Sequence, residues 1–354
     1  MSPVVAERRP PSRTTRYDPP RGPRAPWARI HDVTRPEPAS PRRSRARTAL
    51  AVTTCAVLLG LLALFGASAL TESTHELHIP WGGTTALLRS LLFTALCLQL
   101  GEFAGERLAR TIPDAPGTTP RAWAAPAALA GVLASLGLAV VFAAGDASLT
   151  AGLPALHEMS ATREGKLALL EANAFLLAAL CAWLGRPGWA AVPLAGVILG
   201  EALRAHPEQE TLPIGVALTL VHLSATVLWA GGLVQVLRTM RIWHGGGHRD
   251  AARGLLAVYA RYAALLLAAL AVTGTVSTLR RLPLDQLLSS AYGRTLLIKL
   301  VLVALVSCCA LAARRALLRD RLARTRAVHA ELVTLAAVLV VSALLTVAPL
   351  PVWD

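Results

Sequence analysis

Long apolar runs are the feature of this sequence that most limits its fold. The sequence contains nine mainly apolar segments, at residues 49–70, 84–106, 122–144, 167–185, 189–204, 212–237, 255–279, 294–313 and 329–348. An α-helix of about 20 apolar residues crosses a hydrocarbon core of roughly 30 Å, whereas a membrane β-barrel uses short alternating segments. We therefore predict an all-α, polytopic transmembrane helix bundle with about nine spans.

The number of spans depends on the fifth run. Residues 189–204 are few for a span and include Glu201, so eight spans are the alternative. The segments between the runs are too short for a separately folded domain. Function is therefore expected inside the bundle or at its two faces.

The connections between the runs differ in positive charge. With a cytoplasmic N-terminus, the inner connections 107–121, 186–188, 238–254 and 314–328 contain three, one, four and six arginines. The opposite connections 71–83, 145–166, 205–211 and 280–293 contain no, two, no and two basic residues. Basic loops are typically retained in the cytoplasm. We predict a multi-pass protein of the bacterial cytoplasmic membrane with its N-terminus inside, and no nucleic-acid partner despite the net charge of +14.

The chain divides into three parts by composition. Residues 1–48 contain twelve arginines with many prolines and serines, which predicts a disordered cytoplasmic tail rather than a signal peptide. Residues 49–204 form the N-terminal transmembrane helices, and residues 205–354 form a second transmembrane domain.

His222 is the most unusual residue within the apolar runs. It lies ten residues after Leu212, where an ionisable side chain is costly to place. Histidine is the commonest metal ligand and suits copper, but an intramembrane imidazole can also simply tie helices together. A bis-histidine haem needs a second imidazole at the same depth, and the sequence offers none.

Further candidate metal ligands fall on the predicted outer side. They are His206, His157, Met159, His75 and His78. Imidazoles and a thioether are ligand types that a copper-capturing surface requires. The alternative is that these are ordinary solvated loop residues.

Charged residues within the spans need partners. Arg89, Glu171, Glu201 and Lys299 each cost a few kcal/mol if they face lipid. We predict that they point into the bundle, with Arg89 pairing with Glu171 and Glu201 pairing with Lys299. The alternative to purely structural pairs is a polar access path or a proton relay.

Small and aromatic residues mark two further positions. Gly231 and Gly232 follow Trp229 and are expected to allow close helix packing. Tyr292 and Gly293 precede the eighth run, where an aromatic residue can anchor the helix at the membrane interface.

Together these positions resemble the CopD copper-resistance family of bacterial inner-membrane proteins. The similar elements are His222 with Trp229-Ala230-Gly231-Gly232-Leu233, Arg261-Tyr262, Thr273-Gly274, Tyr292-Gly293, Leu296, Lys299, Glu331 and Leu345-Thr346…Pro349. The resemblance covers about residues 200–350 and includes the turn Ala205-His206-Pro207. One departure is that the chain has only three methionines, so a methionine ladder is absent.

The resemblance implies copper as the cargo and a role in copper homeostasis or resistance. It implies transport across the cytoplasmic membrane, taken as uptake, with His222 and His206 as ligands and a periplasmic CopC-like carrier as partner. No catalytic residues are predicted, and the chain is not expected to be an enzyme. Two alternatives stay open: a non-transporting partner that delivers copper or assists cuproenzyme assembly, and a membrane redox protein.

Overall fold

The computed structural model describes residues 41–72, 81–145, 156–205, 212–281, 287–318 and 325–348. The elements in order are α1 Pro41–Glu72, α2 Gly82–Ala109, α3 Ala124–Ala144, α4 Leu156–Met159, α5 Arg163–Trp183, η2 Pro187–Ala190, α6 Ala191–Arg204, α7 Leu212–Gly245, α8 Arg249–Arg281, α9 Ala291–Leu318 and α10 Thr325–Leu345. Every regular element in these ranges is a helix, which confirms the predicted all-α fold.

The predicted spans coincide with helices. Among the described residues, six helices are long and apolar enough to cross a membrane, and two shorter apolar segments lie in α1 and α10. These helices confirm a polytopic membrane bundle, while the count of nine spans stays a prediction. The expectation for α1 was wrong at its start, because this helix begins at Pro41 rather than at residue 49. Proline is favoured at the first helical position, where its missing N–H costs nothing.

Helices α7 and α8 are longer than a membrane requires. They contain 34 and 33 residues, or about 50 Å of helix each, compared with a hydrocarbon core of roughly 30 Å. Most of the predicted connection 238–254 is therefore helical, because both helices continue into it. Trp243 explains the extension: its side chain is 2% exposed, and its indole Nε1 donates to the Thr118 carbonyl at 3.0 Å.

Glycine then ends α7. Gly247 adopts a φ of 88°, and the His248 amide donates to the Trp243 carbonyl at 2.9 Å. This is the left-handed cap that commonly closes a helix. The connection between α7 and α8 is therefore only a few residues long.

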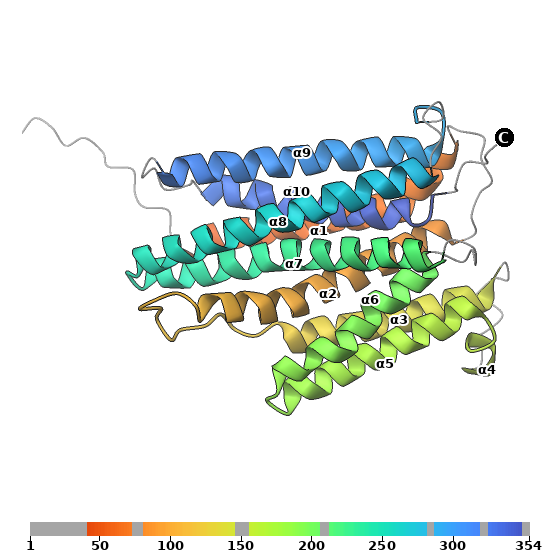
Figure 1. The fold of residues 1–354 in the computed structure, drawn as a ribbon, viewed down its shortest axis with the longest axis horizontal. Helices are drawn as coiled ribbons and strands as arrows, with labels where there is room; N and C mark the ends of the chain where they lie inside the picture. Colours follow the sequence, from red (N-terminus) through yellow and green to blue (C-terminus); the bar gives the residue numbers. More distant parts are fainter. Residues whose placement is uncertain are drawn as a thin grey trace, which may run out of the picture. The chain divides into compact units, whose positions relative to one another are not determined.

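The chain separates into two compact units, Met1–Leu50 and Ala51–Asp354, and each is considered by itself. In the second unit, α2 packs against α3, α7 and α10, and α7 packs against α8 (Figure 1). On one flank α3 packs against α5, which contacts α6, and on the other α9 packs against α10. The division of the sequence into a tail and two transmembrane parts stays a prediction.

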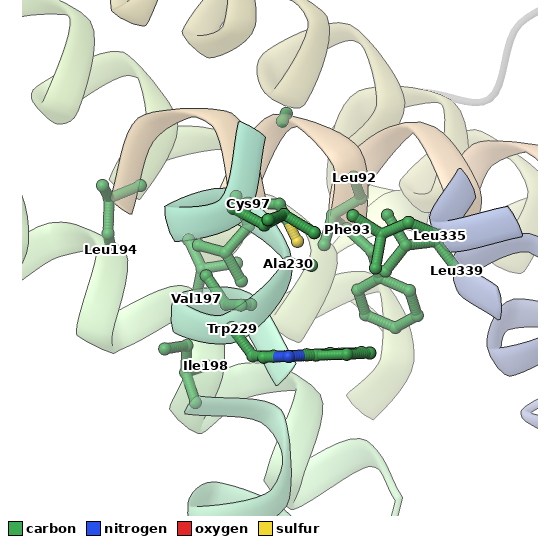
Figure 2. Close-up of a cluster of buried hydrophobic side chains, with 14 of the residues drawn as sticks. Leu92, Phe93, Cys97, Leu194, Val197, Ile198, Trp229, Ala230, Leu335 and Leu339 are labelled. Atoms are coloured by element: carbon green, nitrogen blue, oxygen red, sulfur yellow. The ribbon is translucent and has the colours of Figure 1, made fainter. Parts of the chain in front are cut away.

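The apolar core joins helices that are distant in sequence. Figure 2 shows Leu92, Phe93 and Cys97 of α2 and Leu335 and Leu339 of α10, together with Trp229 and Ala230 of α7 and three apolar residues of α6. These side chains are almost fully buried. The core therefore fixes α7, which carries His222, against α2, α6 and α10.

Large apolar side chains also cover the outside of the bundle. Leu265 of α8 is 69% exposed and Val301 of α9 is 67% exposed. Many leucines on other helices are exposed too. Exposed apolar surface on this scale is unfavourable in water and is expected where helices face lipid. The bundle thus has an apolar exterior as well as an apolar core.

Candidate functional site

His222 is held in one orientation by the neighbouring helix α8. Its Nδ1 lies 2.9 Å from Thr273 Oγ1, and that hydroxyl donates its single proton to the Ala269 carbonyl at 2.7 Å. In the tautomer that keeps the bond from Thr273 to Ala269, the imidazole donates from Nδ1 and the lone pair of Nε2 is available to a ligand. A metal-binding histidine characteristically donates its second ring nitrogen to such a partner.

His222 lines a cavity of about 380 Å³ between the helices. The cavity lining includes polar residues from α2, α6, α7, α8, α9 and α10: Arg89, Glu201, Arg204, Thr219, His222, Thr226, Ser277, Thr278, Tyr292, Lys299, Ser342 and Thr346. Several of these positions lie at the ends of α6, α9 and α10 that are predicted to face outward. The cavity therefore brings together polar residues that are separated by up to 257 positions in the sequence.

A buried ion cluster forms one wall of the cavity. Arg204 donates from Nη1 and Nη2 to the two carboxylate oxygens of Glu171, at 3.0 and 3.2 Å. Its Nη1 also pairs with Glu201. The side chains of Glu171 and Arg204 are 0% and 4% exposed, so this two-pronged pairing occurs out of contact with bulk solvent.

This cluster corrects the predicted ion pairs. Glu171 and Glu201 pair with Arg204, not with Arg89 and Lys299. Arg204 was missed because it ends α6 and resembles an ordinary helix-end cation. Its spacing of three residues from Glu201 was the available signal, since such residues lie on the same helical face.

Arg89 and Lys299 line the same cavity with few partners. Arg89 is 8% exposed and donates from Nη1 to the Thr346 carbonyl at 3.1 Å, while its Nε has no partner. Lys299 makes no hydrogen bond or ion pair with any residue in the described ranges. Both cations therefore keep donors that these ranges do not satisfy.

The two outer candidate ligands that the structure describes, His157 and Met159, do not reach the cavity of His222. His157 is exposed and Met159 is buried in the short helix α4, and neither lines the cavity. His75, His78 and His206 lie outside the described residues. Within the described ranges, no three His, Cys, Asp or Glu side chains converge as a closed metal site.

One soft donor does line the cavity. Cys97 of α2 is 4% exposed and belongs to both the apolar core and the cavity lining. Cys97 was not predicted as a candidate ligand, because a cysteine in an apolar run is most often a small packing residue. Its position on the wall opposite α8 becomes visible only when α2 and α7 are packed together.

Gly231 sits where α2 and α7 approach most closely. A Cβ on Gly231 would lie 1.9 Å from the Cys97 carbonyl oxygen, and one on Gly101 would lie 2.2 Å from the Gly231 carbonyl carbon. Only glycine fits at both positions. Gly232 instead faces the ring of Tyr259, whose hydroxyl donates to the Trp229 carbonyl at 2.6 Å.

Tyr292 and Gly293 lie in the first turn of α9. Tyr292 is 6% exposed and lines the cavity. The Gly293 amide donates to Ser290 Oγ at 3.0 Å, and a Cβ on Gly293 would lie 2.2 Å from the Leu287 carbonyl oxygen. The glycine thus permits the tight turn that precedes α9, and the tyrosine faces the cavity as well as the helix end.

Residues 253–350 match the family model described as Copper resistance protein D, CopD. The match, which defines the CopD segment, covers 98 of the 354 residues. It confirms the resemblance to this family of copper resistance proteins for α9, α10 and most of α8. No curated protein and no solved structure matches the chain.

The CopD segment supplies only part of the cavity. Of the lining residues, Tyr292 and Lys299 lie inside the matched residues, whereas His222, Arg89 and Arg204 lie before them. The match begins at residue 253, so it does not extend over the segment from His222 to Leu233 on which the resemblance also rested. The preceding helices α2, α6 and α7 therefore supply the rest of the cavity lining.

Proposed function

We propose that this protein carries copper into the cell across the cytoplasmic membrane and binds it at Nε2 of His222. The observation that carries the proposal is the hydrogen bond between His222 Nδ1 and Thr273 Oγ1, which leaves Nε2 free on a cavity wall. The CopD match of the segment that contains Thr273 supports copper as the metal.

The sparse set of donors around His222 suits a transient station for copper. Cys97 lines the same cavity and supplies a sulfur, which Cu(I) prefers. A site with few ligands releases its metal more readily than a closed three- or four-ligand site. Such a site favours transfer over permanent storage.

The proposed route begins at the outer end of the bundle. The cavity reaches Ala205 and Ala348 at that end, and Cys97 and Val227 at the other. Beyond Val227, Trp229 and Ala230 belong to the packed core in Figure 2. Inward release of copper therefore requires movement between α2 and α7. A periplasmic CopC-like carrier is our proposed copper donor.

Uptake by purified protein in liposomes tests this function. Copper should accumulate inside liposomes that contain the wild type, and His222→Ala should reduce the initial rate at least about tenfold. His248→Ala is the matched control, because His248 is exposed in the turn between α7 and α8.

The outcome also separates transport from delivery. Copper that binds to the protein but never enters the liposomes would favour a non-transporting delivery partner. In cells, a deletion strain complemented with wild type or His222→Ala should differ in cell-associated copper. Equal copper in all strains would refute transport.

A further inference from the structure

The charges of the cavity do not balance within the described residues. Arg89, Arg204 and Lys299 are cations, and only Glu171 and Glu201 oppose them in this cluster. Both carboxylates are bound by Arg204. The five groups therefore carry a net charge of +1. Glu201 and Glu171 attract Arg89 at longer range without forming an ion pair with it, whereas Lys299 has no anionic partner in the described ranges. A buried cation without such a partner is unfavourable.

Arg89 has the geometry to receive an anion. A guanidinium carries five N–H donors in a planar fork that matches a carboxylate. Arg89 uses Nη1 for the neutral Thr346 carbonyl, and its Nε is buried without a partner. A carboxylate in the cavity would supply the charge-assisted acceptor that this side chain lacks.

Lys299 extends the cationic wall onto α9. Its ammonium has three donors, and it lines the cavity together with Arg89 and His222. This ammonium attracts an anion, and an anion in the cavity would offset the repulsion between the ammonium and a copper ion at His222. The charge on this wall thus points to a ligand other than the metal alone.

The size and lining of the cavity indicate an organic anion. Its 380 Å³ is more than ten times the roughly 30 Å³ that one water occupies in the liquid, and it falls within the range of small-molecule sites. Thr278 and Ser342 offer hydroxyls, while Phe93, Leu296 and Leu339 offer apolar surface. A short carbon chain with carboxylate groups complements both.

We propose that this cavity binds a small aliphatic carboxylate, whose negative charge is held by Arg89 and Lys299. The site lies beside His222 but does not rest on copper binding there. It assigns a ligand class to the excess positive charge of the cavity and to the donors of Arg89 and Lys299 that no described residue accepts.

Titration calorimetry with succinate tests the proposal on copper-free, full-length protein in nanodiscs of zwitterionic lipid. Succinate should bind, and its neutral analogue succinamide should not. Lys299→Gln and Arg89→Gln should each weaken succinate binding about tenfold or more, as expected for loss of a hydrogen bond to a charged group. Lys299→Arg should retain binding.

Lys166→Gln is the matched control. Lys166 is the only other lysine of the chain and is exposed at the start of α5, so its loss should leave succinate affinity unchanged. Equal binding of succinate and succinamide, or unchanged affinity in Lys299→Gln, would overturn the proposal. Loss of succinate binding in nanodiscs of anionic lipid would assign the cations to a lipid headgroup instead and would also overturn it.

Discussion

Thr273 is the residue on which the orientation of His222 depends. Its Oγ1 lies 2.9 Å from His222 Nδ1 and holds the ring with Nε2 free. Thr273→Val keeps the branched shape but removes this acceptor, so His222 loses its fixed orientation and tautomer. Loss of such a supporting hydrogen bond typically lowers metal affinity about 10- to 100-fold. This corresponds to about 1.4 to 2.7 kcal/mol of binding free energy.

The assay is a titration of purified protein with Cu(I) against a competing chromogenic chelator. Thr278→Val is the matched control, because Thr278 lies on the same helix and lines the same cavity, but its hydroxyl donates to the Gly274 carbonyl at 2.8 Å. Thr273→Ser keeps a hydroxyl and should restore most of the affinity. If both valine variants bind copper as the wild type does, the role assigned to Thr273 is wrong.

Three further predictions concern packing, charge and topology. Gly231→Ala should destabilise the bundle by about 1 to 3 kcal/mol, because its Cβ would strike the Cys97 carbonyl; Gly274→Ala should be tolerated, since its Cβ would meet His222 Cε1 at an ordinary 3.6 Å. Denaturation of both variants measures the contrast, and equal stabilities would contradict it. Arg204→Gln should cost about 3 to 5 kcal/mol by the same measurement, because it leaves Glu171 buried and unpaired, and an unchanged stability would argue against the cluster. A cysteine at Gly246 should react with an impermeant maleimide only after the membrane is permeabilised; reaction in intact cells would reverse the topology.

The helices were predictable from the sequence because a membrane imposes a strict requirement. Backbone groups in hydrocarbon must be satisfied within the segment, so an apolar run of sufficient length becomes a helix. The length of the apolar run did not predict where α7 ends. Its last turns are stabilised by the hydrogen bond from Trp243 to Thr118, which is 125 residues away, and no local pattern encodes that contact.

The site was predictable in its residue types but not in its pairs. His222 and the buried charges could be identified because each is costly in an apolar run. Their partners depend on how helices are rotated and aligned against one another. Thr273 meets His222 across 51 residues, and Arg204 meets Glu171 across 33, so neither contact follows from spacing along one helix.

The CopD resemblance pointed to residues that line the cavity, but it did not predict the lining residues contributed by α2. Tyr292 and Lys299 belong to the matched segment, whereas Arg89 and Cys97 of α2 lie more than 150 residues before it. These α2 residues lay in the region where the sequence resembled the family only as a set of membrane helices. The packing of α2 against α7 brings them to the cavity.

Metal analysis of the purified protein tests the central claim most directly. Wild type, His222→Ala and His248→Ala would be loaded with copper under the same conditions, passed through a desalting column and analysed for copper per chain. The account predicts that the wild type and His248→Ala retain the same amount and that His222→Ala loses the copper held in the cavity. Equal copper in all three proteins would contradict the assignment of His222 as the copper ligand.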